Sequence, residues 1–372
     1  MDGWASENTR TPGPPAGPAW MRWLVPLMIV SGVVFEFATP DPYRAGPMLA
    51  AAGPLAAVTL RFRAAVAAVL ADGVVGVLLA LGHTSDPDAH VWLDLVSLGA
   101  VLALSVLIAA LLARGEDRLI EVRAVADAAQ RAVLPTIPRR LGHLEVAVRY
   151  ATARSAARIG GDFYAAEDTR YGVRLLLGDV RGKGLDGIGT VGQIVGAFRE
   201  AAHHVPALAE LAEYLEESTE RWNASSQDSE ADERFATAVL VELPRDEAHL
   251  RIVNRGHIAP LLLRGGGRLS VLEPSRPDLP LGFGRLAPAG TTGPAAVDVV
   301  PFGNGDTLLL YTDGVSEARD ETGACFDLAD ALAGIVPVDL SELLWLVGDQ
   351  VRAFSGGELA DDTALMAVRR TE

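Results

Sequence analysis

The chain has 372 residues, with 48 acidic and 32 basic side chains and a formal net charge of −16 at pH 7. A chain of this length holds two or three domains. The acidic excess argues against a nucleic-acid partner, because phosphate backbones are bound by clustered Lys and Arg. A single cysteine excludes a disulfide framework and a thiolate zinc site. We expect the side chain of that residue, Cys325, to be buried and to pack as a small apolar group.

The N-terminal third is poor in charge. Residues 1–20 are rich in Pro, Gly, Ser and Thr and predict a disordered tail. Over 21–113 the sequence predicts a transmembrane region of about four helices, at 21–39, 46–60, 64–82 and 92–113. A bilayer core of about 30 Å needs roughly twenty apolar residues per helix. The first, third and fourth segments reach that length, whereas Gly53 and Pro54 interrupt the short second one.

Basic residues flank these segments on one side of the predicted membrane. They lie between the second and third segments and after the fourth: Arg61, Arg63, Arg114, Arg118 and Arg123. By the positive-inside rule both termini face the cytoplasm. The sequence therefore predicts a multi-pass protein of the cell membrane with a cytoplasmic C-terminal domain. The alternative is a buried helical bundle in a soluble protein.

A seven-residue apolar repeat follows the fourth segment. Leu112, Leu119, Ala126 and Val133 recur in this register, and Pro135 comes shortly after. The pattern predicts a linker or signalling helix over 114–134 that ends before the proline. Its apolar seam serves either a homodimer through the 112–133 helix or packing against the catalytic domain of the same chain.

The remainder, 135–372, reads as one domain of many strands and a few long helices. Apolar or alternating runs predict strands at 144–151, 171–177, 235–243, 248–254, 259–264, 306–312 and 363–369. Helices are predicted at 206–222 and within 326–354. This mixture implies a layered α/β domain with packed antiparallel sheets and helices outside.

Four aspartates stand at the ends of predicted strands, with glycine close by. Asp162 follows Gly161, Asp179 follows Gly178, and Asp313 precedes Gly314, while Asp361 opens the last strand. One Asp-Gly pair usually marks a turn. Four such carboxylates brought together would repel one another, and divalent cations would offset that repulsion. The pattern therefore predicts a two-metal hydrolytic centre.

Six sequence blocks carry a resemblance to a known family: GGDFYA, GDVRGKG, FATAVLVEL, NRGHIAPLLL, GDTLLLYTDGVSEAR and DDTALMAV. Their order and spacing over about 130–370 resemble the metal-dependent serine/threonine protein phosphatases of type 2C (PPM). The similarity is to the bacterial branch typified by stage II sporulation protein E. It implies an α/β fold, a cytoplasmic PPM-type β-sandwich of two antiparallel sheets flanked by helices. We expect the all-helical transmembrane region to precede it.

The resemblance also implies a ligand set for two ions, Mn²⁺ or Mg²⁺. The residues matching the family's metal-binding and catalytic positions are Asp162, Asp179, Asp313 and Asp361, with Val180 giving a backbone carbonyl. Asp362 matches a position that varies between Asn and Asp and is expected to support the site. The implied reaction is in-line attack of activated water on phosphorus without a phosphoenzyme.

Three positions depart from the family's pattern. Ala165 stands where an aspartate is common, Lys183 where a histidine is common, and Arg255 where an alanine is common. Loss of the carboxylate at 165 would weaken a peripheral metal contact. Lys183 is either a contact for a substrate phosphate or a solvent-facing turn residue. His257 is expected to hold the turn after Asn254 rather than to act as an acid or base.

The function implied by the resemblance is that of a membrane-anchored phosphoprotein phosphatase. Its substrate would be phosphoserine or phosphothreonine on a regulatory protein, an anti-sigma-factor antagonist in particular. A pseudophosphatase that binds a phosphoprotein without turnover is the alternative, which Ala165 keeps open. A transporter-like or purely structural membrane protein is disfavoured, because the four predicted spans are modest.

Overall fold

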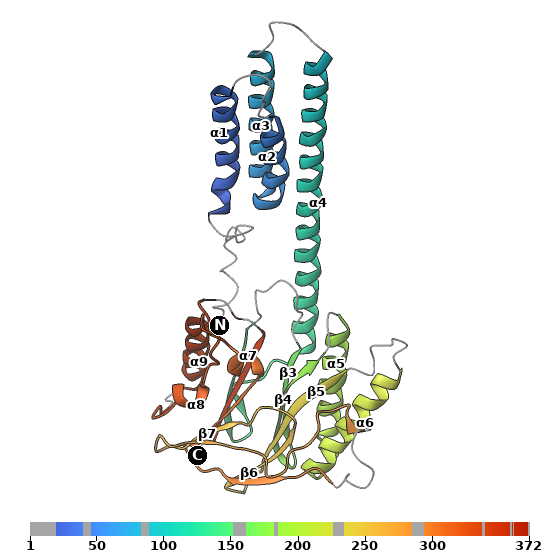
Figure 1. Cartoon of the computed structure of the whole chain (residues 1–372). Coiled ribbons are helices and arrows are strands. Elements are labelled where there is room, and N and C mark those ends of the chain that lie inside the picture. Colours follow the sequence, from blue (N-terminus) through green and yellow to red (C-terminus); the bar gives the residue numbers. More distant parts are fainter. Residues whose placement is uncertain are drawn as a thin grey trace. The chain divides into compact units, whose positions relative to one another are not determined.

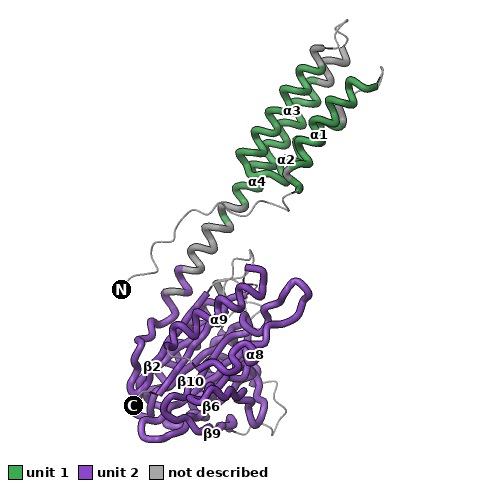
Figure 2. The backbone as a smooth tube through the Cα atoms, turned by 90° about the vertical axis from the view of Figure 1, so that its left-hand side faces the viewer, with its two compact units in different colours: residues 1–122 green, residues 123–372 purple. Residues whose placement is uncertain are grey.

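The computed structural model describes residues 20–39, 46–82, 89–151, 161–181, 185–225, 234–284, 294–336, 339–357, 359 and 361–370. The chain divides into two compact units, residues 1–122 and 123–372 (Figure 2). The predicted disordered tail lies outside the described residues, apart from Trp20. Lys183 also lies outside them, so its predicted role is untested.

The first unit is helical, with α1 (Met21–Ala38), α2 (Gly46–Thr59), α3 (Phe62–Gly82) and the first part of α4 (Ala89–Val133). Two described stretches are long and apolar enough to cross a membrane, Phe62–Leu79 of α3 and Leu95–Gly115 of α4. Within α1, which has 18 residues, the apolar stretch Trp23–Ala38 is shorter.

Large apolar side chains of the first unit point outward. Leu27 of α1, Leu70 of α3 and Leu111 of α4 are all more than half exposed. The helix contacts instead bury small side chains, such as Ala56 and Ala65. Small residues between helices and large apolar residues outside are typical of helices that pack within lipid.

Helix α4 continues as one helix to Val133, as the heptad pattern predicts. It ends immediately before Leu134 and Pro135, where proline stops helices. In the second unit, Val133 packs against the apolar core that α5 (Leu185–Ala201) covers. The last residue of the repeat therefore packs within the second unit of its own chain. The side chains of Leu119 and Ala126 lie outside the described residues.

The second unit contains two antiparallel sheets. The first has the order β1 (Arg140–Leu141), β2 (Leu144–Ala151), β11 (Thr363–Arg370), β10 (Thr307–Tyr311), β7 (Leu261–Leu263) and β8 (Leu269–Val271). The second has the order β3 (Asp162–Thr169), β4 (Gly172–Arg181), β5 (Phe235–Leu243), β6 (His249–Arg255) and β9 (Asp298–Pro301). The ladders confirm the predicted sandwich of antiparallel sheets.

Helices cover the outer faces of the two sheets (Figure 1). Helix α5 packs on β3 and β4, and α6 (Leu208–Ser225) packs on β5 and β6. On the other side, α9 (Leu340–Phe354) packs on β2 and β11. Two short helices, α7 (Asp313–Ser316) and α8 (Leu328–Ala331), complete the described helices. The result is a helix–sheet–sheet–helix arrangement with three apolar layers.

The central strands are apolar on both faces, which explains their continuous runs in the sequence. On β4, Leu175 and Leu177 lie in the core between the sheets, whereas Leu176 lies in the core beneath α5 and α6. On β10, Leu308 belongs to the core between the sheets and Leu309 to the core beneath α9. A strand buried on both faces does not alternate apolar with polar residues.

A buried arginine anchors the connection between α5 and α6. Arg174 on β4 is fully buried and donates to both the Glu242 carboxylate, at 2.6 and 2.8 Å, and three backbone carbonyls. Those carbonyls belong to the segment that joins the two helices: Ala202, Val205 and Pro206. A buried guanidinium is tolerated here because its donors are paired.

Cys325 is exposed, so the prediction that it is buried is wrong. It forms an isolated antiparallel bridge with Arg319, on either side of a turn. Within the turn, the Asp320 carboxylate accepts hydrogen bonds from the backbone nitrogens of Thr322 and Ala324. The turn lies at the protein surface and carries the cysteine with it.

Candidate metal centre

Two of the predicted ligands are direct partners on adjacent strands. Asp162 begins β3 and pairs in register with Asp179 on β4. Both residues therefore belong to one ladder of the second sheet, and their side chains share a face. Gly161 is required just before Asp162, because a Cβ there would overlap the Val180 carbonyl oxygen and Asp179 Oδ1.

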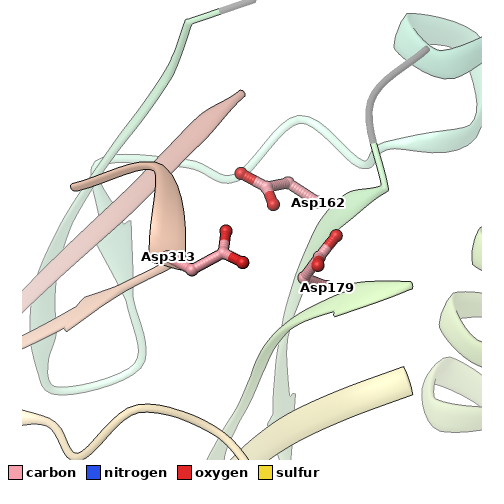
Figure 3. A group of neighbouring side chains, drawn as sticks. All are labelled: Asp162, Asp179 and Asp313. Carbon is pink, nitrogen blue, oxygen red and sulfur yellow. The ribbon is translucent and has the colours of Figure 1, made fainter. Parts of the chain in front are cut away.

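The third predicted ligand comes from the other sheet. Asp313 follows the end of β10 and opens α7. Gly314 allows this segment to approach β11, since a Cβ at 314 would overlap the backbone oxygen of Asp362. Carboxylate oxygens of Asp162, Asp179 and Asp313 lie within 4.8 Å of one another, and the three side chains point toward a common space (Figure 3).

Thr312 connects the two sheets at this site. Its hydroxyl donates to Asp162 Oδ2 at 2.6 Å and accepts from the backbone nitrogen of Ala364 at 2.9 Å. Asp162 belongs to the second sheet, whereas Ala364 belongs to β11 of the first. The threonine therefore fixes the orientation of one carboxylate relative to both sheets.

Burial and the repulsion between neighbouring negative charges raise the pKa values of aspartates in the cluster. Asp162 is 2% exposed, and burial together with the neighbouring Asp179 charge raises its pKa well above the usual value. The hydrogen bond from Thr312 opposes that rise. Burial, followed by the charges of Asp313, Asp361 and Asp362, raises the pKa of Asp179 to about 7. Three crowded carboxylates of this kind favour a bound cation over three free negative charges.

The remaining predicted ligands lie close by in different settings. Asp361 occupies the bend before β11 and contributes to the field at Asp179, but it does not belong to the group within 4.8 Å. Asp362 is buried and accepts a hydrogen bond from the Tyr150 hydroxyl at 2.5 Å. Val180 is buried directly after Asp179, and its backbone nitrogen donates to the Gly161 carbonyl at 3.0 Å.

The donor set fits a hard divalent cation. Carboxylate oxygens, backbone carbonyls and water are the ligands that Mg²⁺ and Mn²⁺ prefer. The described residues at the cluster supply carboxylate oxygens from three strand ends, without cysteine or histidine in the group. The three aspartates that the sequence predicted from separate blocks therefore form a candidate metal centre.

His257 has a structural role at the edge of the site. Its Nε2 lies 3.1 Å from the Tyr311 carbonyl oxygen, which can only accept, so Nε2 carries the proton. Its Nδ1 then accepts from the Thr237 hydroxyl at 2.9 Å. Burial lowers the pKa of His257 to about 4. A neutral histidine that links β5 to β10 agrees with the expected structural role.

Two of the three departures from the family pattern, Ala165 and Arg255, are among the residues that the structure describes. Both lie away from the acidic cluster. Ala165 is fully buried in the apolar core beneath α5. Arg255 is buried and donates to Glu216 at 2.6 Å and to Asp278 at 3.3 Å. Glu216 in turn accepts from the backbone nitrogens of Gly282 and Gly284. Arg255 therefore helps to hold the segment around 278–284 against α6.

Three residues near the centre were missed by sequence reasoning: Gln130, Tyr150 and Thr312. Thr312 stands inside the TDG block beside Asp313, so its position could have been noticed. Gln130 and Tyr150 lie in stretches that carry helix and strand patterns without any polar motif. Only the fold brings them to the aspartates.

A comparison with protein families finds a match to the C-terminal part of the chain. The family described as "Stage II sporulation protein E (SpoIIE)" matches residues 169–371, which is more than half of the chain. The matched region contains Asp179, Asp313 and Asp361 and begins at Thr169, the last residue of the strand that opens with Asp162.

Solved structures similar to this chain include phosphatase domains from several bacteria. The SiaA-PP2C domain of Pseudomonas aeruginosa is 20% identical, with a TM-score of 0.55, covering 70% of this chain and 99% of that chain. The RsbU and RsbW domains of a Mycobacterium tuberculosis protein are 23% identical, with a TM-score of 0.48, covering 61% of this chain and 60% of that one. The SpoIIE phosphatase domain with a regulatory fragment from Bacillus subtilis is 16% identical, with a TM-score of 0.47 and coverages of 61% and 62%. The SiaA domain confirms the type 2C fold, and this chain spans less than two thirds of the other two structures.

Proposed function

This chain belongs to the stage II sporulation protein E family, and from that premise we propose that it is a metal-dependent phosphoprotein phosphatase. Its substrate is phosphoserine or phosphothreonine on a regulatory protein. The observation that carries the proposal is the cluster of Asp162, Asp179 and Asp313, whose carboxylate oxygens lie within 4.8 Å of one another. We assign these residues, with Asp361 and the Val180 carbonyl, to the binding of two Mn²⁺ or Mg²⁺ ions.

The chemistry of phosphate-ester hydrolysis suits this cluster. Bound divalent cations lower the pKa of water toward neutrality and neutralise charge on the phosphoryl oxygens. The protein holds the carboxylates in place, with Thr312 fixing Asp162 through a 2.6 Å hydrogen bond. Burial of Asp162 limits the access of bulk water to that side of the cluster. Such a site needs no nucleophilic side chain.

The proposed biological substrate is a phosphorylated anti-sigma-factor antagonist. Support for this comes from the family resemblance, because regulators of this type are the partners that the family implies. Removal of one phosphate would change which protein the antagonist binds and hence which sigma factor is free. The acidic net charge of −16 gives no support to a nucleic-acid partner.

We also propose that residues 21–113 anchor the protein in the cell membrane, followed by a linker helix at 114–134 and a cytoplasmic phosphatase domain at 135–372. The outward-facing leucines of α1, α3 and α4 support this placement, as do the two long apolar stretches.

Cys325 offers a direct test of this placement, because it is the single cysteine and is exposed. A membrane-impermeant maleimide is expected to label it only after the cells are permeabilised. Labelling of intact cells would refute the cytoplasmic placement.

The heptad of α4 is proposed to pair with a second copy of the chain through Leu112, Leu119 and Ala126. Val133 packs on its own domain, whereas Leu112 is about half exposed. Light scattering of the full chain in detergent is expected to give a dimer. Replacing Leu119 and Ala126 with glutamate should then give a monomer.

Phosphate release from phosphopeptides tests the proposed activity. The full chain in detergent should release phosphate from phosphoserine and phosphothreonine peptides when Mn²⁺ is present. Asp313→Asn should reduce the rate by at least 100-fold. Binding of the peptide without release by the wild-type protein would favour the pseudophosphatase alternative. Release that continues in EDTA would refute a metal-dependent enzyme.

A further inference from the structure

The Tyr150 hydroxyl lies between the end of α4 and the acidic cluster. It is 2.7 Å from Gln130 Nε2 and 2.5 Å from Asp362 Oδ2. Gln130 belongs to α4 and Tyr150 to β2, and Asp362 directly precedes β11. All three residues are in the second unit. Gln130 and Asp362 are almost fully buried, so this short chain of hydrogen bonds is shielded from water.

The direction of the hydrogen bonds follows from the neighbours of Gln130. Its Nε2 also lies 3.4 Å from the backbone carbonyl oxygen of Asp162. That carbonyl can only accept, so the amide nitrogen, and not the amide oxygen, must face it. The Tyr150 hydroxyl therefore accepts from Gln130. Its single proton is then directed to Asp362, which makes Tyr150 the donor to a carboxylate.

Asp362 belongs to the segment that lies against the metal centre. Its backbone nitrogen donates to Asp361 Oδ1 at 3.0 Å. Its backbone oxygen lies where a Cβ at Gly314 would be, directly beside Asp313. Fixing the side chain of Asp362 therefore constrains two neighbouring acidic residues, Asp361 and Asp313. A charge-assisted hydrogen bond from this half-buried tyrosine is strong enough to hold such a segment in place.

We propose that Tyr150 is a positioning residue for the metal centre and that Gln130 fixes the direction of its hydroxyl. The proposal rests on the proposed function, because it concerns how well the aspartates bind divalent cations. Tyr150 does not touch the substrate or the cations. It acts through Asp362, and Gln130 acts through Tyr150 and through the backbone of Asp162.

Removing the tyrosine hydroxyl should weaken cation binding without changing the chemistry that a filled site performs. Residues that orient metal ligands through hydrogen bonds typically change metal affinity by about 10- to 100-fold when they are replaced. Tyr150→Phe should therefore raise the Kd for Mn²⁺ by roughly tenfold or more. At saturating Mn²⁺ its kcat should return to within about threefold of the wild-type value.

A second tyrosine provides the matched control. Tyr164 is half-buried on β3 and packs against the same two apolar cores as Tyr150. Its hydroxyl has no hydrogen-bond partner among the residues that the structure describes. Tyr164→Phe should leave the Kd for Mn²⁺ within about twofold of wild type, because a tyrosine that only packs contributes nothing to ligand geometry.

The experiment is calorimetric titration of Mn²⁺ into the full chain in detergent, for wild type, Tyr150→Phe and Tyr164→Phe. Thermal unfolding in EDTA checks that each variant is folded. Unchanged Mn²⁺ affinity in Tyr150→Phe, or equal losses in both variants, would overturn the proposal. If Tyr150→Phe does not fold, Gln130→Met carries the test with an expected loss of roughly threefold, and an unchanged affinity refutes it. A wild-type chain that binds no Mn²⁺ would instead refute the metal-dependent function itself.

Discussion

Asp162 and Asp179 face each other across the β3–β4 ladder as directly paired residues. Carboxylates at opposed positions of a ladder repel, and this repulsion destabilises a sheet. Burial and neighbouring charge raise the pKa of both side chains. A pair of this kind weakens the metal-free protein, and a cation bound between the carboxylates would remove the penalty.

The first prediction concerns the stability of the metal-free protein. Asp179→Asn removes one of the opposed charges, so we expect the Tm in EDTA to rise by about 2–4 °C, equivalent to roughly 1 kcal/mol for a domain of this size. The same change should abolish Mn²⁺-dependent phosphate release. Differential scanning calorimetry measures the first effect. Asp246→Asn, at an exposed position, is the control and should change neither quantity. A lower Tm for Asp179→Asn would contradict the electrostatic argument.

Local sequence patterns account for much of the fold. The predicted strand at 144–151 matches β2, and the predicted strand at 235–243 matches β5. Both are apolar segments bounded by polar residues or turns, which short-range patterns describe well. The end of α4 was predictable because Pro135 cannot continue a helix. The order of strands in the two sheets was not predicted, because pairing between distant segments leaves no local pattern in the sequence.

The site was predictable only in part. The glycines beside Asp162, Asp179 and Asp313 mark strand ends, so these residues could be chosen from the sequence. Their convergence depends on contacts between distant segments, as in the hydrogen bond from Thr312 to Asp162. Tyr150 lies 212 positions from its acceptor Asp362. No pattern within a short window records such a pair.

Close backbone approach gives a second prediction. Gly161→Ala would place a methyl group against the Val180 carbonyl oxygen and Asp179 Oδ1. We expect at least a 100-fold loss of Mn²⁺-dependent activity, because the backbone before Asp162 must shift. The matched control is Gly196→Ala in α5, where an added Cβ meets nothing within 4 Å. That variant should keep its activity and gain roughly 0.5–1 kcal/mol of stability. Comparable activity in both variants would show that the site tolerates the shift.

A third prediction concerns acid stability. The pKa of His257 is lowered to about 4 by burial, whereas an unfolded histidine titrates near 6.5. Between these values the unfolded state binds a proton that the folded state does not, so stability falls as the pH is lowered from about 6.5 to about 4. The contribution is roughly 3 kcal/mol.

His257→Gln should remove this part of the acid sensitivity, because glutamine can still accept from Thr237 and donate to the Tyr311 carbonyl. Urea unfolding at a series of pH values measures the effect. His204→Gln, at an exposed histidine, should leave the pH dependence unchanged. If the free energy of unfolding falls equally steeply with decreasing pH in His257→Gln and in wild type, the assignment of a buried neutral histidine is contradicted.

A fourth prediction concerns the buried ion pair beneath α5 and α6. Arg174→Met leaves three backbone carbonyls without their donor and removes one partner of Glu242, which Arg251 still contacts at 2.6 Å. We expect a loss of about 3 kcal/mol, seen as a decrease of roughly 6–12 °C in Tm. Arg221→Met breaks an exposed pair with Glu217 and should cost less than about 0.5 kcal/mol. Equal effects of the two changes would argue against a structural role for Arg174.

The most direct test of the metal centre is anomalous diffraction from crystals of the full chain soaked in Mn²⁺. We predict manganese peaks within coordinating distance of Asp162, Asp179 and Asp313, in the space toward which the three carboxylates point. Saturated crystals whose anomalous density avoids that space would contradict the assignment of these aspartates as metal ligands.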